Sequence, residues 1–177
     1  LGKTVKLGVN LDFNSSKSYV DAYRTDYTIY GYEGMLKEKI TKDGFISIGK
    51  INYTQDTKES VYKNNSFNGT FDGNGYVINN LKINEITQKQ DEWEEIGFFS
   101  RNCGTIQNVK LTNVDINLEI SNNVFSSVSA LVGVNYATIN QCYVTGKING
   151  ITNKYSLNIG GITGSNWGTI LECVNKA

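Results

Sequence analysis

Among the residues that could do chemistry, four carboxylates lie close together in one short segment. Asp91, Glu92, Glu94 and Glu95 surround Trp93. Clustered carboxylates are what glycoside hydrolysis and other acid–base reactions require, often beside a cation. Because the segment is a variable stretch between more regular ones, we interpret it as a solvated loop with one buried or half-buried tryptophan. A calcium or sugar role is the alternative, with Trp93 as a candidate ligand-binding residue.

Composition argues against most other catalytic chemistry. The 177 residues include no histidine, which removes Ser-His and Cys-His nucleophile systems and the common zinc sites. The string DGNG at residues 72–75 matches part of a calcium loop, but the ligand spacing of an EF-hand is missing. The glycine-rich stretch NIGGITGSN does not precede a predicted helix, as a phosphate loop would. We therefore predict no catalytic residue, no metal and no cofactor.

Tyrosines in an insertion at residues 14–43 offer a different kind of site. The tyrosine side chain has an apolar ring and a polar tip, which suit contact with a glycan or a protein. The candidate ligand-binding residues there are Tyr19, Tyr23, Tyr27, Tyr30 and Tyr32. Two alternatives remain: the insertion packs over an end or flank of a repetitive sheet, whose edges need capping, or it contacts another domain.

Charge and hydropathy limit the partners. Seventeen basic residues balance seventeen acidic ones, so nothing favours binding to nucleic acid or to an anionic membrane. No apolar run approaches the roughly 18 residues of a membrane span, and we expect no membrane insertion. We expect a fragment of a larger exported protein whose signal and anchor lie outside these residues.

An internal repeat is the strongest pattern in the chain. Four segments align: GNGYVINNLKI, RNCGTIQNVKL, VNYATINQCYV and SNWGTILECVN. Each has asparagine at its second position and isoleucine four residues later, and the asparagines are 28, 33 and 31 residues apart by subtraction. A period near thirty with strand-like alternation predicts one turn of a parallel β-solenoid per repeat. The predicted structural ladders are Asn74, Asn102, Asn135 and Asn166, and Ile78, Ile106, Ile139 and Ile170.

These ladders have a physical basis. A single thirty-residue unit cannot bury its apolar face, so neighbouring units stack and each inward position becomes a column. Asparagine suits a corner where the backbone leaves the β region, because it tolerates left-handed dihedrals, and stacked amides can hydrogen-bond from turn to turn. The alternative is that these asparagines only mark surface turns.

Three cysteines cannot form a complete set of disulfides within the chain. Cys142 and Cys173 share one inward column of adjacent turns, with Cα atoms about 4.8 Å apart, within disulfide range. Their parallel Cβ vectors disfavour the bond, so we predict three free thiols. Cys103 aligns with Tyr136 and Trp167 at an outer corner and is expected to be more exposed.

Before residue 66 the pattern is less regular. Residues 3–13 and 44–51 alternate like strands on either side of the insertion. Helical spacing of Tyr32, Met35, Leu36 and Ile40 predicts one short amphipathic helix near residues 33–40. We expect a single domain over residues 1–177, with opening turns and the insertion in 1–65 and four repeat turns in 66–177.

The repeat resembles the GLUG-motif family, whose turns carry G-L-(V/F)-G followed by N-x-G-x-I. The matching pieces are ALVGVNYATI, GITGSNWGTI and the looser GFFSRNCGTI, and FNGTFDGNGYVINNLKI resembles an opening turn. Ser100 replaces the usual glycine and Thr163 the usual valine. The resemblance implies an all-β, right-handed parallel β-helix and carries no catalytic residues.

GLUG-like repeats imply a secreted or wall-attached bacterial protein. We expect a non-catalytic structural or adhesive module that binds host glycans or extracellular proteins and contacts other domains of its parent chain. The alternative is an accessory domain of a secreted protease, such as an IgA-cleaving metalloprotease, or a carbohydrate-active β-helix.

Overall fold

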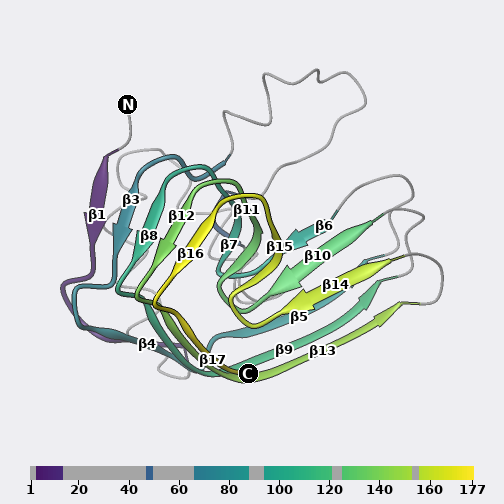
Figure 1. Cartoon of the computed structure of the whole chain (residues 1–177). Coiled ribbons are helices and arrows are strands. Elements are labelled where there is room, and N and C mark those ends of the chain that lie inside the picture. Colours follow the sequence, from purple (N-terminus) through teal and green to yellow (C-terminus); the bar gives the residue numbers. More distant parts are fainter. Residues whose placement is uncertain (1–2, 14–46, 50–65, 88–93, 121–124, 153–155) are drawn as a thin grey trace, which may run out of the picture.

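The computed structural model describes residues 3–13, 47–49, 66–87, 94–120, 125–152 and 156–177 (Figure 1). Every regular element in these ranges is a β-strand, and they contain no helix. The helix expected near residues 33–40 lies outside the described residues, as does the insertion around it.

Three successive groups of four strands form the larger part of the structure, and we call them the first, second and third repeats. The first contains β6 (Glu94–Ile96), β7 (Phe99–Asn102), β8 (Thr105–Gln107) and β9 (Lys110–Ile120). The second contains β10 (Ser126–Ser129), β11 (Val132–Asn135), β12 (Thr138–Asn140) and β13 (Tyr143–Thr152). The third contains β14 (Leu157–Gly160), β15 (Thr163–Asn166), β16 (Thr169–Leu171) and β17 (Val174–Lys176).

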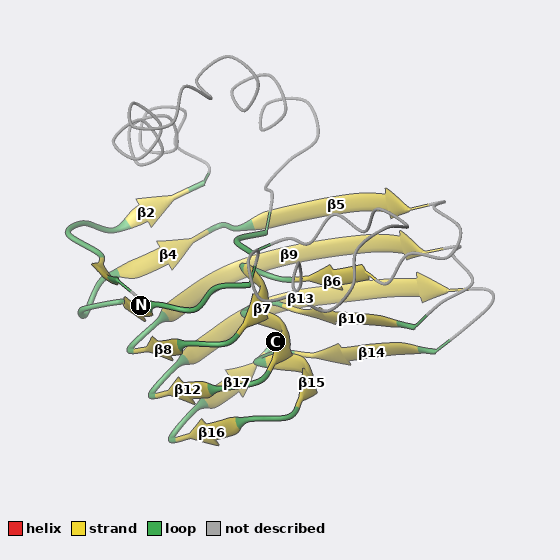
Figure 2. Cartoon of the chain, turned by 90° about the horizontal axis from the view of Figure 1, so that it is seen from above, coloured by secondary structure: helices red, strands yellow, loops and turns green. Residues whose placement is uncertain are grey.

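Strands from the N-terminal part extend two of the sheets. They are β1 (Thr4–Lys6), β2 (Leu11–Asp12), β3 (Thr70–Asp72), β4 (Val77–Asn79) and β5 (Lys82–Thr87). The sheet orders are β1-β3-β8-β12-β16, β2-β4-β9-β13-β17 with β5 also beside β9, β6-β10-β14 and β7-β11-β15. Figure 2 shows corresponding strands following one another along the stack, from β2 and β4 through β9 and β13 to β17.

All pairings between these strands are parallel, and each strand of one repeat pairs with its counterpart in the next. The N-terminal strands follow the same rule. This confirms the all-β, parallel character predicted from the repeat. The arrangement is consistent with a β-helix or solenoid-like fold.

The four sheets enclose one apolar core. Its largest fully buried side chains are Phe99, Ile78, Leu81, Ile96, Ile106, Leu111, Ile116, Ile120, Leu131, Ile139, Val109 and Val114. Each side chain of this size contributes about 1.5–3 kcal/mol through burial. At the N-terminal end the ring of Phe99 lies 5.0 Å from Phe67, 5.3 Å from Phe71 and 5.1 Å from Phe98, centroid to centroid. Three aromatic rings therefore pack around Phe99 within the core.

Two predicted rows are present across the three repeats. Ile106, Ile139 and Ile170 are direct partners on β8, β12 and β16. Asn102, Asn135 and Asn166 are partners on β7, β11 and β15. The asparagine side chains are linked by hydrogen bonds of 2.8 Å, from Asn102 to Asn135 and from Asn135 to Asn166.

The assignment of Asn74 and Ile78 to these rows is wrong. Phe67 bridges to Asn102 and Phe71 pairs with Ile106, whereas Ile78 pairs with Leu111 in the next sheet. Asn74 lies in the turn between β3 and β4, where its backbone N–H donates to Oδ1 of Asp72 at 2.9 Å. Every sheet offers inward apolar residues to the same core, so an apolar pattern alone does not identify the sheet.

The prediction of a left-handed backbone at the row asparagines is also wrong. Asn102, Asn135 and Asn166 are strand residues, and none has a positive φ. The left-handed corner lies between the third and fourth strands of each repeat, at Asn108 (φ 54°), Gln141 (φ 52°) and Glu172 (φ 49°). The row asparagines are therefore selected by their amide contacts and not by a left-handed backbone.

The cysteines are free in the described structure. Cys142 is buried, and its backbone N–H lies 3.3 Å from Sγ of the half-buried Cys173 in the next repeat. Cys103 is exposed, as its place at an outer corner predicted. Burial raises the pKa of the Cys142 thiol from its ordinary value of 9.0 to about 12, so this cysteine acts as a small apolar residue.

Candidate functional site

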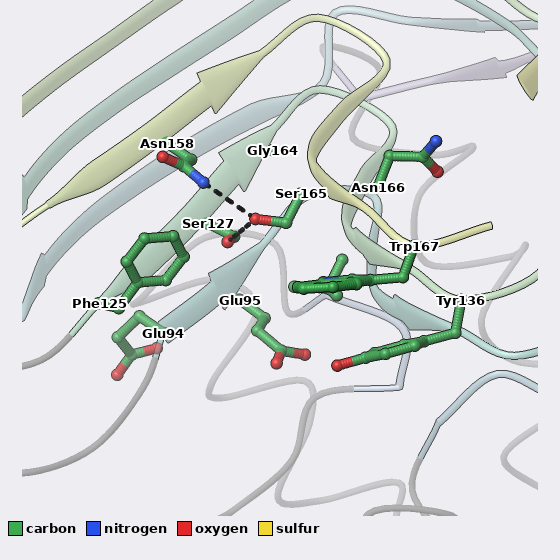
Figure 3. Close-up of a pocket in the computed structure, with 11 residues that line it drawn as sticks. Glu94, Glu95, Phe125, Ser127, Tyr136, Asn158, Gly164, Ser165, Asn166 and Trp167 are labelled. Carbon is green, nitrogen blue, oxygen red and sulfur yellow. Dashed lines mark hydrogen bonds between the residues drawn. The ribbon is translucent and has the colours of Figure 1, made fainter.

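A sharp bend between the first and second strands of each repeat forms a cleft on the outside of the fold. In the second repeat the bend falls at Ala130 and Leu131, between β10 and β11. The outer faces of the two adjoining sheets approach each other there, and Oγ of Ser127 on β10 lies 2.7 Å from Oγ of Ser165 on β15. The cleft has a volume of about 700 Å³. Its lining residues, drawn in Figure 3, are Glu94, Glu95, Phe125, Ser127, Val134, Tyr136, Asn158, Gly164, Ser165, Asn166 and Trp167.

Two glycines next to this bend, Gly133 and Gly164, allow the two sheets to approach each other closely. A Cβ added to Gly133 would lie 2.7 Å from the carbonyl oxygen of Ser100 and 2.8 Å from the backbone nitrogen of Ile96. A Cβ added to Gly164 would lie 2.6 Å from the backbone nitrogen of Val128. Each glycine therefore packs its backbone directly on the first strand of the preceding repeat.

Ser100 occupies the corresponding position in the first repeat. Its side chain is buried, and its hydroxyl donates a hydrogen bond to the carbonyl oxygen of Glu95. This bond ties β7 back to β6 across the bend. The serine that departs from the glycine of the repeat thus has a structural role of its own.

The polar floor of the cleft comes from three side chains. Ser127 is buried, while Ser165 and Asn158 are half-buried. The side-chain amide of Asn158 donates to Oγ of Ser165 at 3.1 Å, and the two serine hydroxyls share a hydrogen bond. A hydroxyl offers one donor and two acceptor positions, so this cluster retains capacity for a ligand that both donates and accepts.

Aromatic residues from consecutive repeats form one wall. Tyr136 follows Asn135, and Trp167 follows Asn166. Their backbones hold equivalent places, because the N–H of Tyr136 donates to Asn102 and that of Trp167 donates to Asn135. The side chains are well exposed, at 49% for Tyr136 and 74% for Trp167. Figure 3 shows both rings projecting in the same direction, towards Glu95.

The carboxylates of the cleft are buried and partnered. Glu94 and Glu95 are 4% and 7% exposed. Arg101 on β7 forms a two-pronged ion pair with Glu95: its Nε lies 2.8 Å from Oε2, and its Nη2 contacts Oε1. The same guanidinium lies 5.3 Å from the ring centroid of Tyr136. The cation thus neutralises Glu95 and supports the aromatic wall.

The structure corrects the interpretation of the acidic segment. Glu94 and Glu95 belong to strand β6 and are buried, whereas a solvated loop was expected. Asp91, Glu92 and Trp93 lie outside the described residues. So do the other predicted ligand-binding residues, Tyr19, Tyr23, Tyr27, Tyr30 and Tyr32.

Most of the residues that line the cleft were not predicted from the sequence. Tyr136 and Trp167 align with Cys103, and the sequence signal for them is an aromatic residue after the row asparagine in two consecutive repeats. Ser127, Ser165 and Asn158 carry no such signal. They meet only because the bend brings two sheets together.

Comparison with known proteins identifies no relative: no family model, curated protein or solved structure matches the chain. Within the described ranges, no three histidine, cysteine, aspartate or glutamate side chains are grouped so that they could hold a metal ion. No helix in this same part of the chain has the length and apolar character to cross a membrane.

Proposed function

We propose that this chain is a parallel β-solenoid domain that serves as a non-catalytic structural and adhesive module of a bacterial surface or secreted protein. The regular parallel register over three repeats supports the solenoid, and right-handed coiling is what the GLUG-like motif implies. The same motif is the reason to place the module outside the cell. Host glycans, extracellular proteins and other domains of the parent chain are the proposed partners.

The observation that carries the binding role is the exposed aromatic wall of Tyr136 and Trp167 above a polar floor. Large aromatic side chains are costly to leave in water, and an aromatic and polar concavity is typical of a ligand site. The wall also arises from the repeat itself, since both residues follow an asparagine of the row. A binding surface of this kind suits an adhesive module.

Glu95 supports the non-catalytic assignment. Both of its carboxylate oxygens contact Arg101, and the pair is buried. A general acid or base must reach the reacting group and exchange a proton with it, which a carboxylate held in a two-pronged ion pair does poorly. We therefore assign the Glu95–Arg101 pair to the architecture of the cleft.

Binding of the whole chain to an immobilised panel of glycans and extracellular proteins tests this function. We expect at least one partner whose binding is lost in Trp167→Ala and retained in Ile151→Ala. Ile151 is a matched control because it is 68% exposed on β13 and is not among the cleft residues. A folded chain that binds nothing on the panel would contradict the adhesive role.

A second candidate, a carbohydrate-active β-helix, is favoured by one observation. Glu94 and Glu95 line the same cleft as the aromatic residues, and paired carboxylates are the usual catalysts of glycoside hydrolysis. Release of reducing ends from a panel of polysaccharides, lost in both Glu94→Gln and Glu95→Gln, would establish this activity. We expect no release.

A further inference from the structure

We propose that copies of this chain associate head to tail, with β1 of one copy added as the next parallel strand beside β16 of another. The surfaces involved are the N-terminal edge, formed by β1 and β2, and the C-terminal edge, formed by β16 and β17. Among the described residues, these strands are outermost in their two sheets. Figure 1 shows β1, β3, β8, β12 and β16 side by side in that order. The proposed assembly is independent of the ligand cleft.

The two edges carry the same rows of residues. A threonine row crosses all five strands of this sheet, at Thr4, Thr70, Thr105, Thr138 and Thr169. The next row is apolar and consists of Val5, Phe71, Ile106, Ile139 and Ile170. Its inner isoleucines, Ile106 and Ile139, are fully buried, whereas Val5 is 45% and Ile170 37% exposed. Stacking β1 of a second copy on β16 continues both rows and covers the two exposed side chains.

Backbone hydrogen bonds define the contact at the level of atoms. Between neighbouring strands of this sheet, the threonine N–H of the later strand donates to the carbonyl of the residue that precedes the threonine of the earlier strand. The series is Thr70 to Lys3 at 3.0 Å, Thr105 to Gly69 at 2.8 Å, Thr138 to Gly104 at 3.1 Å and Thr169 to Ala137 at 2.8 Å. The next acceptor in the series is the carbonyl of Gly168, and Thr4 of the second copy supplies the donor.

The Gly168 carbonyl has the capacity for this bond. Ala137, its counterpart in the second repeat, accepts from the side chain of Asn135 and from the backbone N–H of Thr169. Gly168 accepts from the side chain of Asn166 at 3.2 Å, and a carbonyl oxygen can accept twice. The proposed bond from Thr4 therefore repeats an arrangement that already exists one repeat earlier.

Charges of opposite sign meet across the proposed contact. A row of partners runs from Leu11 to Asn175, so Asp12, which follows Leu11, is placed opposite Lys176, which follows Asn175. Asp12 already accepts from the side-chain amide of Asn80, and a carboxylate has room for a further donor. Charge complementarity of this kind favours a specific register between two surfaces.

One mismatch makes the contact weak. In the row that ends at Leu11 and Asn175, the inner members Ile78, Leu111 and Val144 are fully buried and apolar. The second copy therefore places Leu11 against the polar side chain of Asn175. Replacing this residue in Asn175→Leu should tighten the association by roughly fivefold, because it turns a polar contact into an apolar one.

Sedimentation equilibrium of the whole chain tests the inference. The weight-average mass should rise from the monomer value of 19.7 kDa towards at least twice that value between about 10 μM and about 1 mM, as expected for a small contact. Val5→Glu and Ile170→Glu each place a charge in the contact, one at each edge, and each should weaken association by about tenfold or more. Ile151→Glu is the matched control, because Ile151 is 68% exposed on β13 beyond the stretch that pairs with β17.

A mixture of the two edge variants distinguishes a head-to-tail contact from a symmetric one. Val5→Glu keeps its C-terminal edge and Ile170→Glu keeps its N-terminal edge, so together they should form a dimer and nothing larger. Circular dichroism should show that each variant remains folded. A chain that stays monomeric throughout, association that either edge variant leaves intact, or an equal mixture that remains monomeric would overturn the inference. Loss of association in Ile170→Glu alone would indicate two C-terminal edges in symmetric contact.

Discussion

The side-chain amide of Asn102 donates a 2.8 Å hydrogen bond to Oδ1 of Asn135, and neither side chain is exposed to solvent. The side-chain amide of Asn135 donates in turn to Oδ1 of Asn166 at 2.8 Å and to the carbonyl oxygen of Ala137 at 3.0 Å. A buried amide needs partners for both its oxygen and its nitrogen, so each asparagine depends on the next. The row therefore fastens three strands to one another through their side chains.

The middle position of this row should be the most sensitive to substitution. We expect Asn135→Ala to lower the free energy of unfolding by roughly 2–4 kcal/mol, because it leaves a cavity and removes partners of Asn102 and Asn166. Asn166→Ala, at an exposed position of the row, should cost less than about 1 kcal/mol. Urea unfolding of both variants gives the comparison. Equal losses would show that the amides act independently.

Close backbone contact at the bend predicts a strong effect of a single methyl group. Gly133→Ala should destabilise the protein by about 3 kcal/mol or more, because the added carbon would collide with backbone atoms of Ser100 and Ile96. Gly8→Ala is the matched control, since no atom lies within 4 Å of the carbon it would add. Thermal unfolding measures both. Similar midpoints for the two variants would contradict the close approach.

Glu95 and Arg101, the ion pair next to Tyr136, should be strongly coupled in their effects on the free energy of unfolding. Removing only the cation, in Arg101→Met, leaves Glu95 as an uncompensated buried charge and should cost about 3–5 kcal/mol. In Glu95→Gln/Arg101→Met that charge is absent, so the loss should be smaller. A double-mutant cycle by chemical unfolding measures the coupling. Additive single effects would mean that the pair contributes nothing beyond packing.

The cysteines should differ in reactivity. In the native protein at pH 8 a thiol reagent should label Cys103 rapidly and Cys142 slowly, because Cys103 is exposed and burial raises the pKa of Cys142 to about 12. In denaturant all three thiols should react. Finding only one would establish a disulfide between Cys142 and Cys173.

The same pKa shift predicts a loss of stability in alkali. The folded state holds the Cys142 proton more tightly than the unfolded state, whose thiol ionises near 9.0. This contribution is present in full below pH 9 and is lost as the pH rises towards 12. The free energy of unfolding of Cys142→Ala should therefore depend less steeply on pH in this window. A parallel pH dependence in both proteins would contradict the assignment.

Particular residues show how far the sequence could predict the fold. Ile106, Ile139 and Ile170 were placed in one row from their spacing alone, and they are strand partners. Ile78 has the same local pattern but belongs to the next sheet, beside Leu111. Apolar alternation indicates that a residue faces the core, but it does not indicate to which of the four sheets the residue belongs.

The cleft was harder to predict for a related reason. Ser127 and Ser165 are 38 positions apart, on different sheets of different repeats. No local pattern marks them, because their contact depends on the angle between two strands and not on the period of either. Glu94 and Glu95 were visible as carboxylates, but the acidic segment suggested solvent until strand pairing placed them in a sheet.

The sequence by itself determined the repeat, the parallel β-strands that it produces, and the asparagine and isoleucine rows of the three repeats, because these follow from stacking similar units in register. Only the tertiary structure decided the sheet to which each N-terminal strand belongs, the burial of Glu95 against Arg101, and the meeting of Trp167 with a floor of serines. All three depend on contacts between residues far apart in the chain, such as the close packing of the Gly133 backbone on Ile96, which no local sequence pattern specifies.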